Sequence, residues 1–191
     1  MTLSKATQKF LGLDELSSNQ EIIESLISKF PGLRFHEIKK ETGLANGTLQ
    51  HHLGELIKIE TIEANYDRST PRYYSKDVDE GSQIIIRRLS QITTSRIIKA
   101  LLKNECQTFS QLVKQTKKSP GTVSIYKNML LKDRIIIGDT NSCECNKREG
   151  TSKIKYRLMD EEKIHMILQE YGKTPLQKSA DNLADVFLSI K

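Results

Sequence analysis

Two short clusters of side chains in this sequence have the types that metal or redox chemistry uses. His51 and His52 are adjacent imidazoles in a segment with helical spacing. Neighbouring helical residues point about 100° apart and rarely share one metal ion, so we expect His52 at a core edge and His51 facing outward. Cys143 and Cys145 are separated by one residue, which suits a soft metal or thiol oxidation. Zinc normally needs four ligands at wider spacing, so we expect no metal site and keep a thiol sensor as an alternative.

The sequence contains no sign of a catalytic site. No nucleophile, base and acid occur at a recognisable spacing, and neither a glycine-rich phosphate loop nor a pair of catalytic carboxylates is evident. The three cysteines are an odd number and do not indicate a disulfide framework. We therefore expect a protein without enzymatic activity and without a bound cofactor.

Positive charge is concentrated in the middle of the chain. Residues 83–134 contain eleven Lys and Arg residues and two acids, a net charge of +9, whereas the whole chain carries +6. A concentrated positive field is what a polyanionic partner requires. A solvated basic surface without a partner is the plainer alternative, but the charge and the motif described next together favour nucleic acid.

A pair of short helices joined by a tight turn is predicted between Phe35 and Ile62. Gly43 ends the first helix, because glycine accepts the left-handed backbone found at helix ends. The second helix has one apolar face at helical spacing, formed by Leu49, Leu53 and Leu56. Its opposite face is polar and carries Gln50, His51 and Gly54. Two short helices with a glycine-containing turn form the helix-turn-helix pattern.

The same pattern recurs 74 residues later in the chain. Phe35, Thr42, Gly47 and Leu56 match Phe109, Thr116, Gly121 and Leu130, and the match extends upstream and downstream of both helix pairs. A self-match at a fixed offset is the mark of a duplicated module. We therefore interpret the chain as two copies of one module of about 75 residues, each near the lower size limit for an independent core.

The elements that must position these residues follow in one order: helix, helix, helix, strand, loop, strand. Ser18 or Asn19 can cap the first helix, which Pro31-Gly32 stops. After the helix pair, residues 59–65 and 72–75 are predicted to be extended around a polar turn, which makes a β-hairpin, or wing. In the second copy the predicted strands are residues 134–138 and 153–158, joined by a longer polar loop.

Helices are also predicted between the copies and after them. Residues 79–102 have helical spacing, with a break expected at Thr93-Thr94. We expect Arg87 and Arg88 to face outward there. The residues expected to face the body of the protein are Ile84, Ile85, Leu89 and Ile92. In the tail, residues 160–171 are predicted to be helical, and residues 176–190 repeat apolar positions at heptad spacing. Packing on its own domain and a homodimer seam both remain open for that last helix.

The predicted fold is mainly α with small β-hairpin wings, in five parts. These are an N-terminal arm (1–18), a first winged helix-turn-helix domain (19–78), a linker helix (79–94), a second winged domain (95–158) and C-terminal helices (159–191). No apolar run approaches the roughly 20 residues that span a bilayer, and the first residues lack a secretory apolar region. We therefore expect a cytoplasmic protein with no membrane partner.

The segment PGLRFHEIKKETGLANGTLQHHLGEL, residues 31–56, resembles the winged helix-turn-helix transcription regulators of the ArsR and MarR kind. More closely, the chain is similar to archaeal-type regulators built from two winged helices in tandem. The likeness is specific in the first copy, looser in the second and absent from the tail. The resemblance implies a transcription regulator whose second helix enters the major groove of double-stranded DNA while the wing lies on the backbone or in the minor groove.

Carried over to this chain, the resemblance implies DNA contacts from both copies. In the first copy they are Asn46, Thr48, Gln50, His51, Arg68 and Arg72. In the second copy they are Lys117, Lys118, Thr122, Ser124, Lys127 and Asn128. Gln and Asn pair with adenine edges, and Arg suits phosphate. The second copy departs from the pattern, because Ile125 replaces His51 and Lys127 replaces Leu53, so part of that helix is expected to serve packing.

Two other functions remain open. A winged helix also serves as a protein–protein interaction module within the transcription machinery, which the outward Ile125 and the heptad-spaced tail would suit. The third possibility is a thiol- or metal-responsive repressor, in which Cys143 and Cys145 would alter DNA affinity on oxidation or metal binding.

Overall fold

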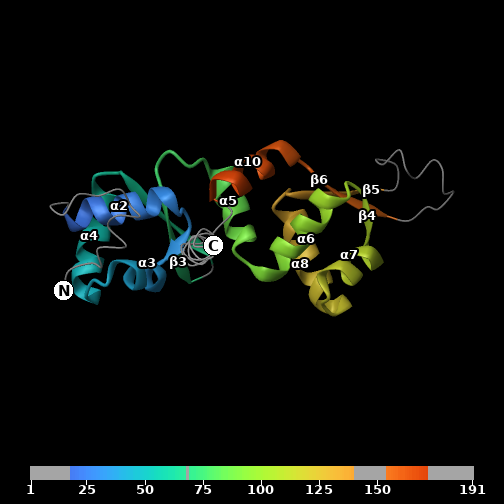
Figure 1. Cartoon of the computed structure of the whole chain (residues 1–191), viewed down its shortest axis with the longest axis horizontal. Coiled ribbons are helices and arrows are strands. Elements are labelled where there is room, and N and C mark those ends of the chain that lie inside the picture. The colour runs from blue at the N-terminus through green and yellow to red at the C-terminus, as the bar shows by residue number, and fades with distance from the viewer. Residues whose placement is uncertain (1–17, 68, 140–153, 172–191) are drawn as a thin grey trace, which may run out of the picture. The chain divides into compact units, whose positions relative to one another are not determined.

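The computed structural model of this chain describes residues 18–67, 69–139 and 154–171, and it divides into two compact units within helix α5. Unit 1 comprises the described residues up to Gln83, and unit 2 comprises those from Ile84 onward. In each unit, three helices and a β-hairpin follow the predicted order, and a short additional strand before the second helix completes a three-stranded antiparallel sheet (Figure 1). This confirms the mainly helical fold with small hairpins.

Unit 1 begins with helix α2 (Asn19–Lys29), whose start is set by a capping box. The Ser18 hydroxyl accepts a hydrogen bond from the Glu21 amide at 3.3 Å, and the Glu21 carboxylate accepts one from the Ser18 amide at 2.8 Å. These two bonds satisfy backbone donors that a helix N-terminus otherwise leaves unpaired. The predicted cap at Ser18 and the predicted stop before Pro31 are both confirmed.

The predicted helix pair of unit 1 is present as α3 (Phe35–Thr42) and α4 (Asn46–Lys58). Gly43 ends α3 in the left-handed region at φ 67°, as its position predicts. The Thr42 hydroxyl donates to the Ile38 carbonyl at 2.8 Å, which satisfies a hydroxyl that is almost completely buried. The turn that joins the two helices is therefore held by glycine geometry and by a buried side-chain hydrogen bond.

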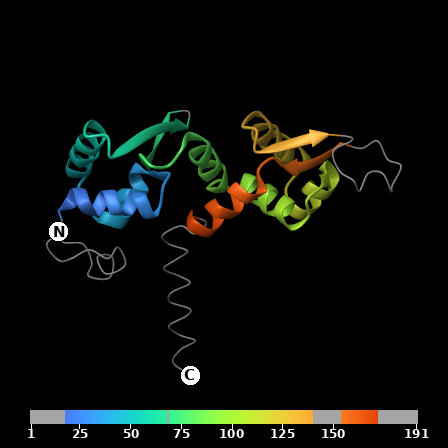
Figure 2. The same cartoon turned by 90° about the horizontal axis from the view of Figure 1, so that it is seen from above.

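The sheet of unit 1 has the order β1 (Leu33–Arg34), β3 (Thr70–Ser75), β2 (Ile62–Asp67). Strands β2 and β3 pair from Ile62 with Ser75 to Asp67 with Thr70, and they are the teal-to-green pair of strands in Figure 2. Strand β2 begins three residues later than predicted, because α4 continues to Lys58 and Glu60 turns the chain at φ 58°. The two-residue strand β1 was not predicted.

The core of unit 1 is built mainly of isoleucine and leucine from α2, α3 and α4, closed on one side by the sheet. Ile23, Ile27, Ile38 and Leu49 have no exposed surface. Each large aliphatic side chain buried in this way stabilises the fold by about 1.5–3 kcal/mol before the entropy cost of ordering is subtracted. The rest of this core consists of Ile22, Leu26, Phe30, Leu33, Leu53, Leu56, Ile62 and Tyr73.

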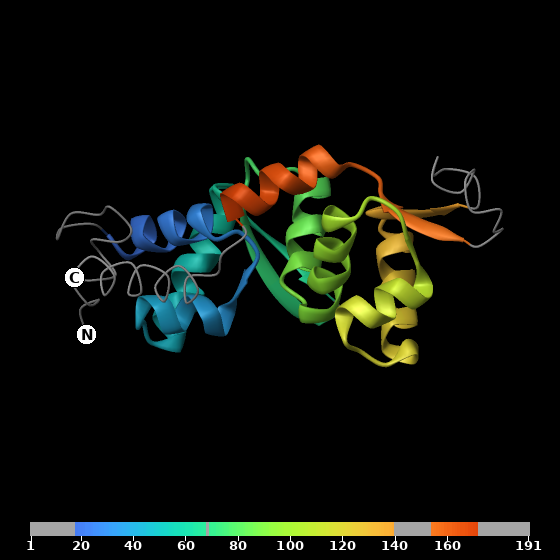
Figure 3. The same ribbon diagram turned by 45° about the vertical axis from the view of Figure 1, so that its right-hand side comes forward.

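Unit 2 repeats the plan and adds a terminal helix. Its elements are the greater part of α5 (Glu80–Leu89), then α6 (Ile92–Lys103), β4 (Gln107–Thr108), α7 (Phe109–Thr116), α8 (Pro120–Lys132), β5 (Ile136–Asp139), β6 (Lys155–Leu158) and α10 (Glu161–Tyr171). The sheet order is β4-β6-β5, which matches β1-β3-β2. Figure 3 shows the golden-orange β5–β6 strands beside the yellow helix α8. Helix α10 lies within the predicted helical run 160–171, and its Ile164 and Ile167 are buried.

The duplication extends to single backbone angles and hydrogen bonds. Thr116 Oγ1 donates to the Leu112 carbonyl at 2.8 Å, which repeats the bond of Thr42 at the same offset. Lys117 caps α7 at φ 53°, where unit 1 has Gly43. Arg134, with φ 54°, repeats the positive φ of Glu60. The two modules therefore share a backbone even where their side chains differ.

The segment between the two helix-turn-helix pairs differs from the prediction in three respects. The helical run breaks at Ser90-Gln91, not at Thr93-Thr94, because the Thr94 hydroxyl donates to the Gln91 carbonyl at 3.0 Å and so stabilises the first turn of α6. Arg88, expected to face outward, is 7% exposed and paired with Asp133. Ile92, expected to face the body, is 70% exposed.

Several predictions concern residues outside the described part of the chain. They are the N-terminal arm, Arg68 at the wing turn, the loop that carries Cys143 and Cys145, and the helix at 176–190. These stay predictions, as does the five-part division into domains. Among the helices that the structure describes, none is long and apolar enough to cross a membrane.

Candidate nucleic-acid interface

The outer face of α4 presents a row of exposed polar side chains. Asn46, Thr48, Gln50 and His51 are all exposed, whereas Leu49, between Thr48 and Gln50, is completely buried. The buried leucines fix the rotation of the helix, so the polar side chains are held toward solvent by the core behind them. Near its C-terminal end, α4 carries Glu55, whose pKa is lowered by a hydrogen bond from Lys58 and by that ammonium's charge.

The two adjacent histidines of α4 have different surroundings. His51 is exposed, while His52 is partly buried and its Nε2 lies 3.5 Å from Nδ2 of Asn19 on α2. Their ring centroids are 5.4 Å apart and the rings are tilted by 54°. Within the described residues, no group of three or more potential metal ligands is assembled. The arrangement matches the predicted roles of His52 at the core edge and His51 on the outside.

Arg72 is not available for the predicted phosphate contact at the wing. It is 5% exposed, and its Nη1 donates to the Gly32 carbonyl at 2.6 Å. The cause is the sheet register, because β3 pairs with β1 and places Arg72 opposite Arg34. The burial of Arg72 does not support the predicted phosphate contact, and this guanidinium ties the segment after α2 to the sheet.

The wing of unit 1 also has an exposed aromatic residue that the sequence analysis missed. Tyr66 on β2 is 63% exposed and pairs with Pro71 near the hairpin end. By contrast, Tyr73 is 8% exposed, and burial, followed by the nearby Tyr66, raises the pKa of its phenol. The exposure of Tyr66 could have been predicted from its position beside the turn, because the end of a hairpin seldom buries a large ring.

The outer face of α8 is less polar than that of α4. Ile125 is 64% exposed at the position of His51, and Asn128 is exposed one turn further along. Thr122 is half-buried and belongs to the helix cap, with its hydroxyl 2.8 Å from that of Ser119. Ser124 is half-buried as well. Of the predicted contacts on this helix, Asn128 is the one most open to solvent.

Lys127 is directed toward its own unit rather than toward solvent. Its Nζ donates to the Tyr156 hydroxyl at 3.2 Å and lies 5.0 Å from the centre of that ring and 5.6 Å from the ring of Phe109. These are cation–π distances. The ammonium occupies the position where unit 1 has the core residue Leu53, so its predicted DNA contact is not supported by the packing.

Lys117 and Lys118 lie in the turn between α7 and α8, and both are exposed as predicted. They belong to a unit with strong positive charge. Residues 84–139 and 154–171 contain fourteen basic and seven acidic residues, a net charge of +7, whereas residues 18–83 contain eight basic and eleven acidic residues, a net charge of −3. The exposed polar helix and the positive field are thus on different copies of the module.

Cys106 directly precedes β4 and is half-buried. It is bonded in a disulfide, so the odd number of cysteines did not exclude a pairing. Cys143 and Cys145 lie outside the described residues, and the sensor role suggested for them stays a hypothesis.

Two family models match the chain in the order of its two units. One, described as an N-terminal HTH domain, covers residues 17–86, and the other, described as bacterial regulatory protein, arsR family, covers residues 93–137. A search of curated proteins finds no match. The first match contains all of α2, α3, α4 and the wing, and the second contains α7 and α8. Both models indicate a DNA-binding regulatory protein. The chain therefore carries two helix-turn-helix domains in tandem, an N-terminal one followed by one of the arsR type, as tandem winged helix-turn-helix regulators do.

Proposed function

We propose that this protein regulates transcription by binding double-stranded DNA through α4 and α8, the second helices of its two helix-turn-helix pairs. The observation that carries the proposal is the outer face of α4. Its polar side chains are exposed along one side while the leucines of the other side fill the core. A helix supported from behind in this way suits the major groove, which is wide enough to admit it.

Each exposed side chain of α4 has a chemical role available at base edges. Asn46 and Gln50 carry amides, which can donate to N7 and accept from the N6 amino group of adenine. The Thr48 hydroxyl suits a base or a phosphate, and the His51 imidazole donates or accepts according to its tautomer. Sequence preference would therefore come mainly from α4.

The contacts proposed for unit 2 are chiefly electrostatic. Lys117 and Lys118 are exposed beside the N-terminus of α8, and Asn128 lies further along that helix. Lysines at such a position neutralise phosphates and add affinity that does not depend on sequence. Arg72 and Lys127 are left out of this site, because both are engaged within their own units.

The proposal predicts that changing the outer face of α4 reduces the preference of the protein for its own DNA site. Replacing Gln50→Ala together with His51→Ala should reduce the preference for the selected DNA site over unrelated DNA by about 1–3 kcal/mol. The measurement is a fluorescence anisotropy titration with DNA selected from genomic fragments. The control is Ser28→Ala, an exposed polar position on α2 outside the proposed site. Absence of any DNA binding by the unaltered chain at low salt would refute the proposal.

The exposed Ile125 favours a second candidate function, a protein-interaction module of the transcription machinery. This residue is 64% exposed on the outer face of α8, where a base-reading helix would carry a polar group. An apolar side chain at that place suits a protein partner. Under this alternative, the chain would co-purify with a polymerase or factor subunit and show no affinity for DNA alone, and Ile125→Asp would abolish the co-purification.

A further inference from the structure

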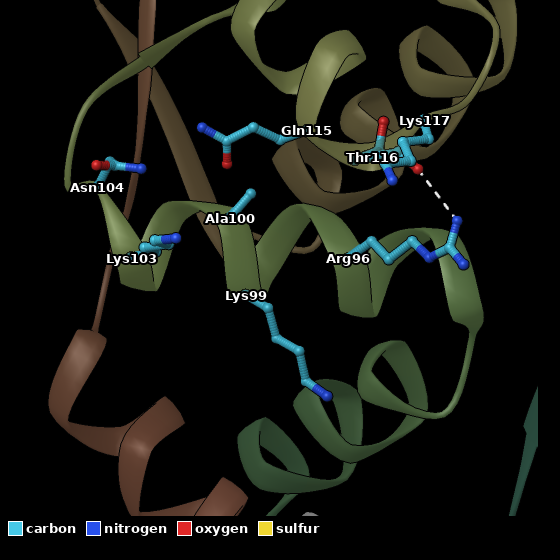
Figure 4. A pocket seen from close by; sticks show the side chains of 8 residues that line it. All are labelled: Arg96, Lys99, Ala100, Lys103, Asn104, Gln115, Thr116 and Lys117. Carbon is cyan, nitrogen blue, oxygen red and sulfur yellow. Dashed lines mark hydrogen bonds between the residues drawn. The ribbon is translucent and has the colours of Figure 1, made fainter.

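Unit 2 contains an open cavity of about 610 Å³ between α6 and the C-terminal end of α7 (Figure 4). Four cationic residues line it: Arg96, Lys99, Lys103 and Lys117. Ala100 and Thr116, both buried, are among its other lining residues, and no acidic residue lines it. Of the residues in the proposed DNA contacts, Lys117 lines the cavity, whereas Lys118 and Asn128 do not.

The geometry of α6 gathers these charges on one side. Arg96, Lys99 and Lys103 are spaced by three and four residues, which places them on one helix face. The Arg96 guanidinium donates from Nη1 to the Thr116 carbonyl at 3.1 Å, drawn as the dashed line in Figure 4, and so reaches across to the end of α7. Lys117 follows at once, as the residue that caps α7.

These four cations differ in their pairing from Arg88, another cation of unit 2. Among the residues that the structure describes, none of the four forms an ion pair, whereas Arg88 pairs with Asp133 in the same unit. Helix dipoles favour cations at the C-terminal ends of helices by about 0.3–1 kcal/mol each. That accounts for Lys103 and Lys117 but not for Arg96 and Lys99, which lie in the interior of α6.

Unit 1 provides an internal comparison, because it has the same backbone 74 residues earlier. There, Arg96 and Lys99 correspond to Ile22 and Ser25, Asn104 to Phe30, Gln115 to Glu41, and Lys117 to Gly43. Ile22 and Phe30 are 3% and 4% exposed, so unit 1 has apolar packing where unit 2 has the cavity. Lys103 corresponds to Lys29 of unit 1, whereas the other three cations, Arg96, Lys99 and Lys117, belong to unit 2 alone.

We propose that this cavity binds a phosphate-bearing anion, either a free phosphorylated ligand or a phosphate of a nucleic-acid backbone. Guanidinium and ammonium groups that line one cavity without a carboxylate are suited to phosphate oxygens, which accept strong charge-assisted hydrogen bonds. The anion would also relieve the mutual repulsion of the four cations. For a backbone phosphate the inference rests on the proposed function, and for a free ligand it stands independently.

The test replaces two of the cations by the residues that unit 1 has at the same positions. The cavity variant is Arg96→Ile with Lys99→Ser, which leaves Lys117 and the other proposed DNA contacts unchanged. The control variant is Lys114→Ser with Lys132→Ser, which removes two exposed cations outside the cavity and changes the net charge equally. Circular dichroism checks that both variants fold.

Inorganic tripolyphosphate is the probe, titrated by calorimetry at fixed ionic strength, and binding of a DNA duplex is measured in parallel. We expect the cavity variant to bind tripolyphosphate about tenfold more weakly than the unaltered chain, a change of about 1.4 kcal/mol, and the control to change less than about twofold. Loss of tripolyphosphate binding with DNA binding equal to that of the control identifies a free ligand. Loss of DNA binding beyond that of the control identifies a backbone phosphate.

Two outcomes would overturn the inference. In one, the cavity and control variants lose affinity for tripolyphosphate and DNA to the same extent, so that only net charge matters. In the other, the unaltered chain does not bind tripolyphosphate and the two variants do not differ on DNA. A chain that binds tripolyphosphate through the cavity but has no affinity for DNA would instead refute the proposed function and leave this inference standing.

Discussion

At the scale of single residues, one backbone position shows how the two copies have diverged. Gly43 and Lys117 both end a helix in the left-handed region, at φ 67° and 53°. Glycine adopts this conformation without a steric penalty, whereas a residue with a Cβ loses about 1 kcal/mol or more there. Unit 2 therefore bears a conformational cost at Lys117 that unit 1 avoids.

The first prediction is that adding a Cβ at residue 43 destabilises the fold, whereas removing the side chain at residue 117 does not. Gly43→Ala should lower the free energy of unfolding by about 1 kcal/mol, because a Cβ is strained at positive φ. Lys117→Gly should raise it or leave it unchanged, because the strain is removed while the unfolded chain gains freedom. Urea denaturation followed by circular dichroism measures both. A loss of stability in the Lys117→Gly variant would contradict the argument.

The second prediction concerns pH and rests on Tyr73. Burial raises the pKa of this phenol above its value of 10.0 in an exposed tyrosine. A group with a raised folded-state pKa contributes stability that is complete below the unfolded pKa and is lost as pH rises through the folded value. Stability should thus fall above about pH 10, and Tyr73→Phe should make that fall shallower. Thermal melts across this range, with Tyr126→Phe in unit 2 as the control, test the assignment.

Burial could be predicted for residues that follow a local helical pattern. It could not be predicted for residues whose partners are distant in the sequence. Leu49, Leu53 and Leu56 follow from helical spacing alone, and all three are buried. Arg72 and Arg88 look like surface cations in sequence, but the first is bonded to a carbonyl 40 residues away and the second to a carboxylate 45 residues away. No local pattern signals such partners.

At the scale of elements, the pair of Arg88 and Asp133 joins α5 to the C-terminal end of α8. Arg88 Nε is hydrogen bonded to Asp133 Oδ2, and the two side chains are 8% and 14% exposed. Asp133 is also the C-cap residue of α8. The contact therefore fixes the C-terminal end of α8 against α5.

The third prediction is that removing one charge of this pair lowers the free energy of unfolding more than removing both charges does. Asp133→Asn leaves the Arg88 charge buried without its counter-charge and should lower the free energy of unfolding by about 3–5 kcal/mol. Combining it with Arg88→Met removes both charges and should recover part of that loss. A double variant as unstable as the sum of the single variants would show that the two side chains are not coupled.

The long elements were predictable because their periodicity is repeated over several turns. Helices α3, α4, α7 and α8 and the hairpin strands were all expected close to their observed bounds. Strands β1 and β4 were missed, because two residues are too short to show alternation and are defined only by their pairing with β3 and β6. At the candidate interface, the exposed face of α4 could be predicted from the sequence. The packing of Lys127 could not, because it depends on where the fold places Tyr156.

At the scale of the whole molecule, the duplication has separated two properties that a single winged helix usually combines. Unit 1 carries the more polar outer helix face on a body with a net charge of −3, and unit 2 carries a net charge of +7 around a helix with an exposed isoleucine. If both units contact DNA, affinity should depend mainly on unit 2 and sequence preference mainly on unit 1.

The final prediction tests this division through salt dependence. Each phosphate neutralised by a protein cation contributes about 0.9 to the slope of log affinity against log salt, because bound counterions are released. Lys117→Glu with Lys118→Glu should therefore weaken binding to every sequence alike and reduce the magnitude of the slope by about two. The matched control is Lys39→Glu with Lys40→Glu, which reverses two exposed charges on α3 of unit 1. Anisotropy titrations at several salt concentrations should show a smaller change for this control, since unit 1 already has a net negative charge. Equal changes in slope for the two pairs would mean that both units hold the backbone equally, and the assignment of affinity to unit 2 would then be wrong.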